Sequence, residues 1–438
     1  ARGFGRSTPA KSEVGEPNEG AAVLKRAPQR PNFPPPMPPK PAAAKKGAPP
    51  APDAGNPFAP RVQYAVALTG DGKLHSYWVS NGNETKPGVP FIPAGANAHG
   101  LIVIDGVAYV GTSNSCGGSE NAVYALDVAT GNVTKWKAGG QGVAGNAGPA
   151  FGPDGTVYAA TTEGELAALE AKSLSVLAST KLAGAGFTSS PVVFPHKGKD
   201  LVAVAVNDGT IAVFDTANLG AGPVARSQAY TSKGYATGSL TSWMDAAGTR
   251  WILAPAGGTA VNDAGFQMAD GPVKNGTIAA LKLLDANGGG LALRNGWASR
   301  DLVSPVAPIV VNGVVFALSS GENRTGDLKT AIEKSQPAVL YAMDPFSGKV
   351  LWNSGKAMTS FSHSGLSSGG GRVYTDVTGE MFTLQLETEF ADLGAYAAFM
   401  ARDQEHFATQ AFQEWFAKTV PLTDGGSRQL LNVEHVGV

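Results

Sequence analysis

The feature that most constrains this 438-residue chain is an internal repeat that runs from residue 61 to about residue 387. Each repeat contains a short apolar segment, a turn with glycine, and a second apolar segment with a pair of small residues. The second segments begin at residues 74, 123, 166, 211, 278, 340 and 381. A period of forty-odd residues with two longer steps is typical of a β-propeller, in which each repeat forms one sheet.

The fourth repeat illustrates the pattern, with residues 202–205, the pair Asp208-Gly209, and residues 211–215. Valine, alanine, isoleucine and aromatic residues suit a strand that is covered on both faces. The Asp-Gly pair supplies the positive φ of a tight hairpin turn. The two longer steps place insertions at about 256–275 and 320–338, which we expect to be loops. The sequence therefore predicts an all-β protein, a β-propeller with seven blades, with six or eight as the alternatives.

Residues 1–60 form a separate, proline-rich zone that holds 15 of the chain's 30 prolines. Proline fixes φ and lacks an N–H group, so a helix or central strand cannot run through this zone. Polyproline II is the conformation that such a segment favours. Two interpretations stay open: a solvated linker, or an extended arm that docks on another subunit. In the second case Phe33, Pro35 and Pro38 are the predicted contact residues.

Residues 388–438 form the third zone, where apolar residues recur mostly at three- and four-residue steps. This spacing predicts one or two amphipathic helices. The helical extension either packs on the propeller or binds a partner, with Phe407 and Trp415 as the partner-binding candidates. Residues 430–436 are predicted to return as a strand that closes the ring, because the first repeat lacks an innermost strand and the last lacks an outermost one.

Charge and cysteine content exclude several classes of protein. The chain has 34 Lys+Arg against 35 Asp+Glu, so it is not a nucleic-acid-binding protein that works by bulk positive charge. Cys116 is the single cysteine, which excludes a disulfide framework. No apolar run is long enough to form a transmembrane helix. The chain begins with Ala1-Arg2-Gly3 rather than methionine, which is compatible with a processed, exported protein of the periplasm, cell envelope or extracellular space.

Two repeats carry a longer motif: a small residue, an aspartate, a hydroxyl residue followed by glycine, and a tryptophan. In chain order the motif residues are Ala125, Asp127, Thr130, Gly131 and Trp136, then Ala342, Asp344, Ser347, Gly348 and Trp352. The motif resembles the tryptophan-docking repeat of the pyrroloquinoline quinone (PQQ) propeller superfamily. The resemblance implies that the aspartates cap the turn, that the glycines take a left-handed conformation, and that the tryptophans wedge between adjacent blades.

Two branches of that superfamily imply different functions. The PQQ-dependent alcohol dehydrogenases bind PQQ and a Ca²⁺ ion and carry a vicinal cysteine pair, which a chain with only Cys116 cannot form. The other branch is the non-catalytic propeller lipoprotein of outer-membrane protein assembly, which binds partner proteins. The departure from the dehydrogenase pattern favours the non-catalytic branch, with no cofactor and no metal ion.

The six histidines form neither an HExxH nor a CxxCH pattern, so zinc-protease and c-type haem sites have no support. His99 and His363 each precede or begin a predicted innermost strand, and we expect both to line the central channel. There they either bind a metal ion or an anion, or fill the channel and hydrogen-bond to neighbouring backbone.

The sequence as a whole favours a non-catalytic interaction subunit of a larger, envelope-associated protein complex. The N-terminal arm and the C-terminal helix are its predicted docking elements, with peripheral association to a membrane complex and no nucleic acid. Two alternatives stay open. One is a PQQ-dependent dehydrogenase with a divergent site, and the other is a glycan-binding propeller that uses Trp78 and Trp243 as exposed aromatic residues.

Overall fold

The computed structural model describes residues 64–78, 82–286, 289–325, 327–363, 365–369, 372–374, 409–410 and 413. The chain divides into two units, residues 1–62 and 63–438, and every described residue belongs to the second. Several predictions therefore concern residues outside the described ranges: the proline-rich arm with Phe33, Pro35 and Pro38, the side chains of Phe407 and Trp415, and the ring-closing strand at 430–436.

The second unit is built from antiparallel sheets whose strands follow one another in chain order. The first sheet has three strands among the described residues, and the next five are complete. The strands are, sheet by sheet, β1 (Tyr64–Leu68), β2 (Lys73–Trp78) and β3 (Glu84–Pro90); β4 (Asn97–Ile104), β5 (Val107–Ser113), β6 (Ala122–Asp127) and β7 (Val133–Lys137); β8 (Ala150–Phe151), β9 (Val157–Ala160), β10 (Glu165–Leu169) and β11 (Val176–Lys181); β12 (Val192–His196), β13 (Lys199–Ala205), β14 (Ile211–Asp215) and β15 (Pro223–Arg226); β16 (Thr241–Met244), β17 (Arg250–Gly257), β18 (Gln267–Met268), β19 (Gly276–Asp285) and β20 (Leu291–Ala298); β21 (Ile309–Val311), β22 (Val314–Ser319), β23 (Val339–Met343) and β24 (Val350–Asn353); and β25 (Ser367–Gly369) and β26 (Arg372–Tyr374).

The repeat predicted from sequence is confirmed in the first six sheets. The expected second segments fall on β2, β6, β10, β14, β19 and β23, and each pairs with the segment before it. The predicted segment at residue 381 lies outside the described residues. The seventh sheet is described as the β25–β26 hairpin.

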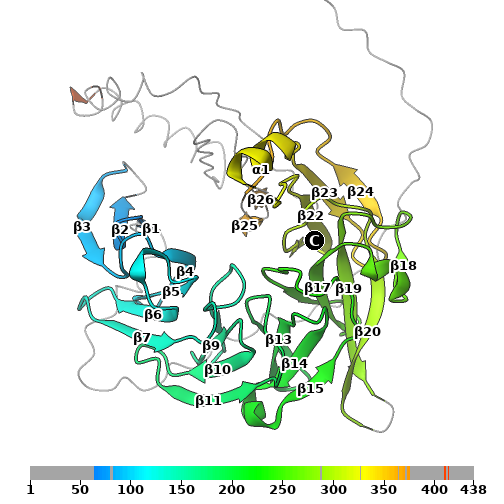
Figure 1. The fold of residues 1–438 in the computed structure, drawn as a ribbon, viewed down its shortest axis with the longest axis horizontal. Coiled ribbons are helices and arrows are strands. Elements are labelled where there is room, and N and C mark those ends of the chain that lie inside the picture. The colour runs from blue at the N-terminus through cyan, green and yellow to red at the C-terminus, as the bar shows by residue number, and fades with distance from the viewer. Residues whose placement is uncertain are drawn as a thin grey trace, which may run out of the picture. The chain divides into compact units, whose positions relative to one another are not determined.

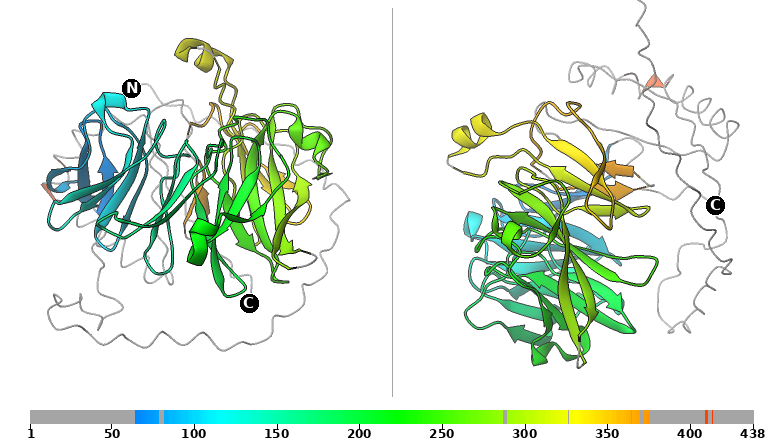
Figure 2. Two further views of the ribbon diagram at one scale, coloured as in Figure 1. Left: turned by 60° about the horizontal axis from the view of Figure 1, so that its bottom comes forward. Right: turned by 90° about the vertical axis from the view of Figure 1, so that its right-hand side faces the viewer.

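Within this unit the sheets succeed one another around a common centre, as in a β-propeller (Figures 1 and 2). In Figure 1 the first strand of a sheet lies toward the centre, as β4 does, and the last lies at the periphery, as β3, β7, β11 and β24 do. We call the last strand of each complete or three-stranded sheet its outer strand. The strand order places β8, β12, β16 and β21 at the inner edge in the same way.

Strand β6 shows why these sequences form doubly covered strands. Ala122, Tyr124 and Leu126 face one side and pack against the first sheet, whereas Val123 and Ala125 face the other side and pack against the third. All five are buried. Alternate side chains of a strand point to opposite faces, so a strand between two sheets must be apolar at every position.

Among the first six sheets, each pair of consecutive sheets shares one apolar core. Leu74 of the first sheet joins residues of the second, and Trp136 of the second packs with Val157 of the third. Phe214 joins the third and fourth sheets, and Trp297 the fifth and sixth. Each such side chain contributes about 1.5–3 kcal/mol relative to an exposed one, so the stacking of sheets provides the main stabilisation.

The two insertions contain more structure than the predicted loops. The first carries a 3-10 helix (η3, Ala260–Asp263) and β18, which pairs in parallel with β20 and covers the outer edge of the fifth sheet. The second carries helix α1 (Leu328–Lys334), which projects away from the sheets (Figure 2). Asp327 caps this helix because its side chain accepts from the Thr330 N–H at 2.8 Å. Two further 3-10 helices are η1 (Cys116–Gly118) and η2 (Thr216–Ala221).

In the predicted C-terminal helical segment the structure describes Thr409, Gln410 and Gln413. The Gln413 N–H donates to the Thr409 carbonyl oxygen at 3.1 Å, the four-residue spacing of an α-helix. Among the described residues, no helix combines the length and apolar character that crossing a bilayer requires.

Candidate functional site

The turn between β23 and β24 is organised by Asp344. Its Oδ1 accepts hydrogen bonds from the N–H groups of Phe346 (3.1 Å) and Ser347 (2.8 Å) and from the Ser347 hydroxyl (2.7 Å). Gly348 follows at φ 69°, in the left-handed region. Ala342 is buried in β23 just before this turn. The aspartate and glycine therefore stabilise this turn.

The second sheet repeats this turn between β6 and β7. Asp127 Oδ1 accepts from the N–H groups of Ala129 (3.1 Å) and Thr130 (3.0 Å), and Gly131 has φ 76°. The hydrogen bond from the Thr130 N–H is the largest influence that lowers the pKa of Asp127. Ala125, which precedes Asp127 in β6, is buried in the core that the second sheet shares with the third.

The two motif tryptophans differ in their surroundings. Trp136 is 8% exposed and packs with Val157 and Leu169 of the next sheet. Trp352 is 54% exposed, and most of the seventh sheet that would lie beside it falls outside the described residues, so its wedging between blades stays a prediction.

At the inner side of the propeller, the segments that precede β8, β12 and β16 touch one another. We call them the lead-in segments of the third, fourth and fifth sheets. The Gly238 carbonyl oxygen accepts from the N–H groups of Ser190 (2.8 Å) and Asn146 (3.2 Å), and the Gly238 N–H donates to the Thr188 carbonyl oxygen (3.0 Å). The Ala147 N–H donates to the Ser190 hydroxyl oxygen (2.9 Å).

These contacts require glycine. A Cβ on Gly145 would lie 1.9 Å from the Ser190 nitrogen and 2.3 Å from the Gly238 oxygen, distances that no side chain tolerates. Three lead-in segments thus meet backbone to backbone.

His99 lies in β4 opposite Gly111. A Cβ on Gly111 would lie 3.1 Å from His99 Cε1, so the glycine leaves the space that the imidazole occupies. Burial lowers the pKa of His99, and neither ring nitrogen has a hydrogen-bond partner among the described residues. Burial therefore disfavours the protonated form of the His99 imidazole.

His363 has different surroundings. It precedes β25, is largely exposed, and its Nδ1 lies 2.6 Å from Glu322 Oε1. Glu322 Oε2 also accepts from the Arg324 Nε–H at 2.9 Å. His363 is therefore held by an acidic residue of the second insertion, whereas His99 packs beside Gly111. The described residues bring no three His, Cys, Asp or Glu side chains together in a metal-binding arrangement.

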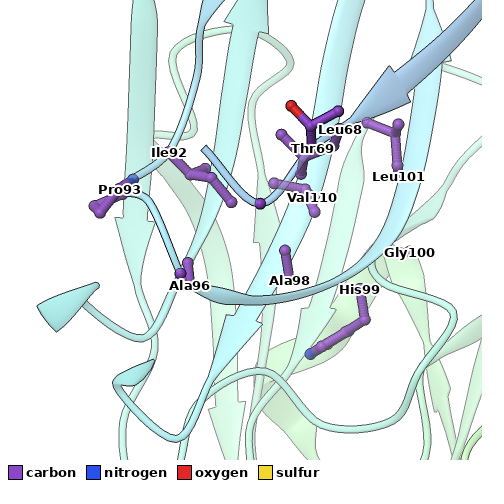
Figure 3. A pocket seen from close by; sticks show the side chains of 12 residues that line it. Leu68, Thr69, Ile92, Pro93, Ala96, Ala98, His99, Gly100, Leu101 and Val110 are labelled. Atoms are coloured by element: carbon purple, nitrogen blue, oxygen red, sulfur yellow. The ribbon is translucent and has the colours of Figure 1, made fainter. Parts of the chain in front are cut away.

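A cavity of about 310 Å³ lies between the first and second sheets (Figure 3). Its lining includes Leu68 at the end of β1, Ile92 after β3, and His99, Leu101 and Val110 of the second sheet. The imidazole of His99 projects away from Leu68 and Leu101 in Figure 3. The cavity therefore combines apolar side chains with one imidazole, that of His99.

The aromatic residues that are well exposed are not the ones that the sequence suggested. Trp78 and Trp243 are half-buried, and Trp243 stacks on Trp251 with ring centroids 6.1 Å apart. Phe346, at 55% exposure, packs edge-on against Trp243 at 5.8 Å. The glycan-binding alternative needed open faces on Trp78 and Trp243, and the stacking on Trp251 occupies one face of Trp243.

Sequence reasoning missed Phe346 and Leu351 as surface residues. One signal was available, because Phe346 stands where the sister motif of the second sheet has Ala129. Cys116, the single cysteine, is exposed in η1.

Comparison with known families gives one match. Residues 119–221, from the second through the fourth sheet, match the sequence model of the family described as outer membrane protein assembly factor BamB. This stretch includes the motif residues Asp127 and Trp136. A comparison with curated protein sequences gives no match.

Among solved structures the chain is similar to BamB from Moraxella catarrhalis, with 15% identity, a TM-score of 0.46, and coverage of 72% of this chain and 76% of that one. It is also similar to the computationally designed Ika8 protein, with 13% identity, a TM-score of 0.44, and coverage of 72% and 77%. The Dos1 propeller aligns with 13% identity, a TM-score of 0.39, and coverage of 64% and 66%.

Proposed function

We propose that this chain is a non-catalytic propeller that acts as an interaction subunit of a larger protein complex in the cell envelope. The observation that carries the proposal is the contact of three lead-in segments through the Gly238 carbonyl oxygen, which joins the inner ends of the third, fourth and fifth sheets into one rigid support. The match of residues 119–221 to an outer-membrane assembly factor supports the envelope setting.

The charged side chains support the same conclusion. Asp127 and Asp344 cap turns, Asp301 accepts from the N–H groups of Lys274 and Asn275, and Asp215 pairs with Lys199 at 2.7 Å. Each is committed to a structural hydrogen bond or ion pair. A scaffold needs such rigidity, because it presents its loops and edges to partners at fixed geometry.

The N-terminal arm and the C-terminal segment are the proposed docking elements. Extended segments that flank a rigid domain add a second contact to a complex and raise its overall affinity without a new folded surface. The test is affinity purification of the full chain from the envelope fraction of its native cells, compared with a variant that lacks residues 1–60. We expect the full chain to sediment in a larger complex. The truncated chain should keep its thermal stability and leave the complex.

A separate measurement addresses catalysis. The purified full chain is mixed with PQQ and Ca²⁺, and cofactor absorbance and dye reduction are recorded. We expect neither stoichiometric uptake nor turnover. Turnover with bound quinone would overturn the non-catalytic assignment, and unfolding of the truncated chain would overturn the docking role of the arm.

A further inference from the structure

The outer strands of a propeller expose unpaired backbone groups, and proteins protect such edges with charge, proline or a covering segment. The first five described outer strands each have one of these devices. They are Glu84, Lys86 and two prolines in β3, Lys135 and Lys137 in β7, Lys181 in β11, Pro223 and Arg226 in β15, and Arg294 with the covering strand β18 in the fifth sheet.

Strand β24 has none of them. Its sequence is Val-Leu-Trp-Asn, without charge or proline, and no strand of the described residues pairs with its outer edge. Leu351 is 61% exposed and Trp352 54%. An uncharged, apolar, open edge is the kind that accepts another strand.

The turn next to this edge is held in place. Asp344 caps the turn through its side chain. The Phe346 ring of the same turn packs edge-on against Trp243 and Trp251 of the fifth sheet. The corresponding turn of the second sheet has the small Ala129, and the corresponding tryptophan there is buried. The sixth sheet therefore departs from its sister by presenting Phe346 on a rigid support beside β24, which lowers the entropy that a partner must overcome on binding.

Charge at the two ends of β24 indicates what the edge can bind. Lys349 precedes the strand and Lys356 follows it, both are exposed, and neither makes an ion pair with a described residue. Antiparallel pairing with a second copy would bring Lys349 of one chain to the same end as Lys356 of the other. Like charges oppose such pairing, whereas a partner with acidic ends is attracted.

We propose that the outer edge of β24 binds an extended segment of a partner protein, which has an uncharged, alternating apolar centre and acidic residues at both ends and adds to the sixth sheet as a further strand. Its backbone would pair with β24, its apolar side chains would contact Leu351 and Trp352, and its acidic ends would meet Lys349 and Lys356. This inference rests on the proposed function and names the kind of partner that the scaffold takes.

The test uses the full chain and a fluorescent peptide of alternating threonine and valine with two glutamates at each end. Binding is followed by anisotropy, and backbone pairing by hydrogen exchange of the amides of residues 350–353. We expect saturable binding that slows exchange at these amides. A peptide with lysines at its ends should bind about tenfold more weakly, because attraction becomes repulsion. A peptide with central prolines, which lack N–H groups, should not bind.

The matched variants are Leu351→Lys on β24 and Leu177→Lys on β11, where Leu177 is 59% exposed on another outer strand. Both introduce a charge on an exposed outer strand, and both variants should keep the thermal stability of the wild type. Leu351→Lys should weaken the acidic peptide about tenfold, and Leu177→Lys should leave binding unchanged. Equal effects of the two variants, or no saturable binding of the acidic peptide, would overturn the proposal.

Sedimentation of the full chain without peptide tests whether a second copy of the chain binds the outer edge of β24 instead. A dimer that Leu351→Lys dissociates would assign the edge to a second copy and overturn the partner proposal. Purification of the envelope complex distinguishes failure of the β24 site from failure of the scaffold function. If Leu351→Lys stays in that complex, the β24 site is wrong and the scaffold function stands; if the wild-type chain forms no complex at all, the scaffold function itself is wrong.

Discussion

The indole N–H of Trp297, at the end of β20, donates a hydrogen bond to the Pro345 carbonyl oxygen at 2.8 Å. It joins the fifth sheet to the turn that follows β23. The same ring lies so close to this turn that a Cβ on Gly348 would be 2.3 Å from it. The turn that presents Phe346 is therefore fixed from the neighbouring sheet as well as by Asp344.

Replacement of Trp297 by phenylalanine should destabilise the protein by about 2 kcal/mol, because the Pro345 carbonyl oxygen stays buried and loses its donor. Urea unfolding followed by circular dichroism measures the change. Trp352→Phe, at an exposed position, is the matched control and should change stability by less than about 0.5 kcal/mol. Equal values for the two variants would show that the hydrogen bond contributes nothing.

Asp344→Ala should cost about 1–2 kcal/mol, because two N–H groups and a hydroxyl lose their acceptor. Asp344→Asn keeps an acceptor oxygen of the same geometry and should lose less than half as much. The comparison by urea unfolding separates hydrogen bonding from charge. An asparagine variant as unstable as the alanine variant would contradict the capping role.

The two motif tryptophans should respond differently to removal. Trp136→Ala should cost about 3–5 kcal/mol because it leaves a cavity in a shared core. Trp352→Ala should cost less than about 1 kcal/mol because the side chain is mostly in solvent. Thermal and urea unfolding of both variants check this difference, and a large loss at Trp352 would mean that its ring is covered in the folded protein.

Gly145→Ala should destabilise the protein by about 3 kcal/mol or more, because the added Cβ meets the backbone of two other lead-in segments and φ is +80°. Gly155→Ala is the control: its φ is +87°, but no atom lies within 4 Å of the added Cβ. It should cost only about 1 kcal/mol from backbone strain. Similar losses at both positions would contradict the close approach of the lead-in segments.

His99 should make stability depend on pH. Burial lowers its pKa below the ordinary 6.5, so the unfolded chain binds a proton more readily than the folded one. The stabilisation is complete above pH 6.5 and is lost as the pH falls below that value. The His99→Leu variant should show a shallower loss between pH 6.5 and 5, with His196, whose pKa burial also lowers, retaining part of the slope. Melting temperatures across this range test it, and identical profiles would mean that His99 is not buried in the folded state.

The repeat pattern was sufficient to predict the sheets, because apolar alternation and turn residues act locally. The pair Asp208-Gly209 and the strand at 211–215 occur where the sequence placed them. The insertions were less predictable. Residues 267–268 form β18 only because β20 offers an open edge, and that edge exists only in the folded sheet.

The candidate site was predicted only in part. The sequence pointed to His99 and His363 together, yet one packs beside Gly111 and the other pairs with Glu322, because their neighbours come from segments distant in the chain. The exposure of Trp352 and the closeness of Gly145 to Gly238 likewise depend on which sheet lies beside which. No local pattern encodes those distances.

The sequence by itself determined the strand repeat, the capped turns at Asp127 and Asp344, and the absence of paired cysteines, since each follows from the side chains of a few neighbouring residues. Only the tertiary structure decided that three lead-in segments meet at the Gly238 carbonyl and that no strand of the described residues pairs with the outer edge of β24. Burial and edge exposure are properties of neighbouring sheets, and they arise when the sheets stack.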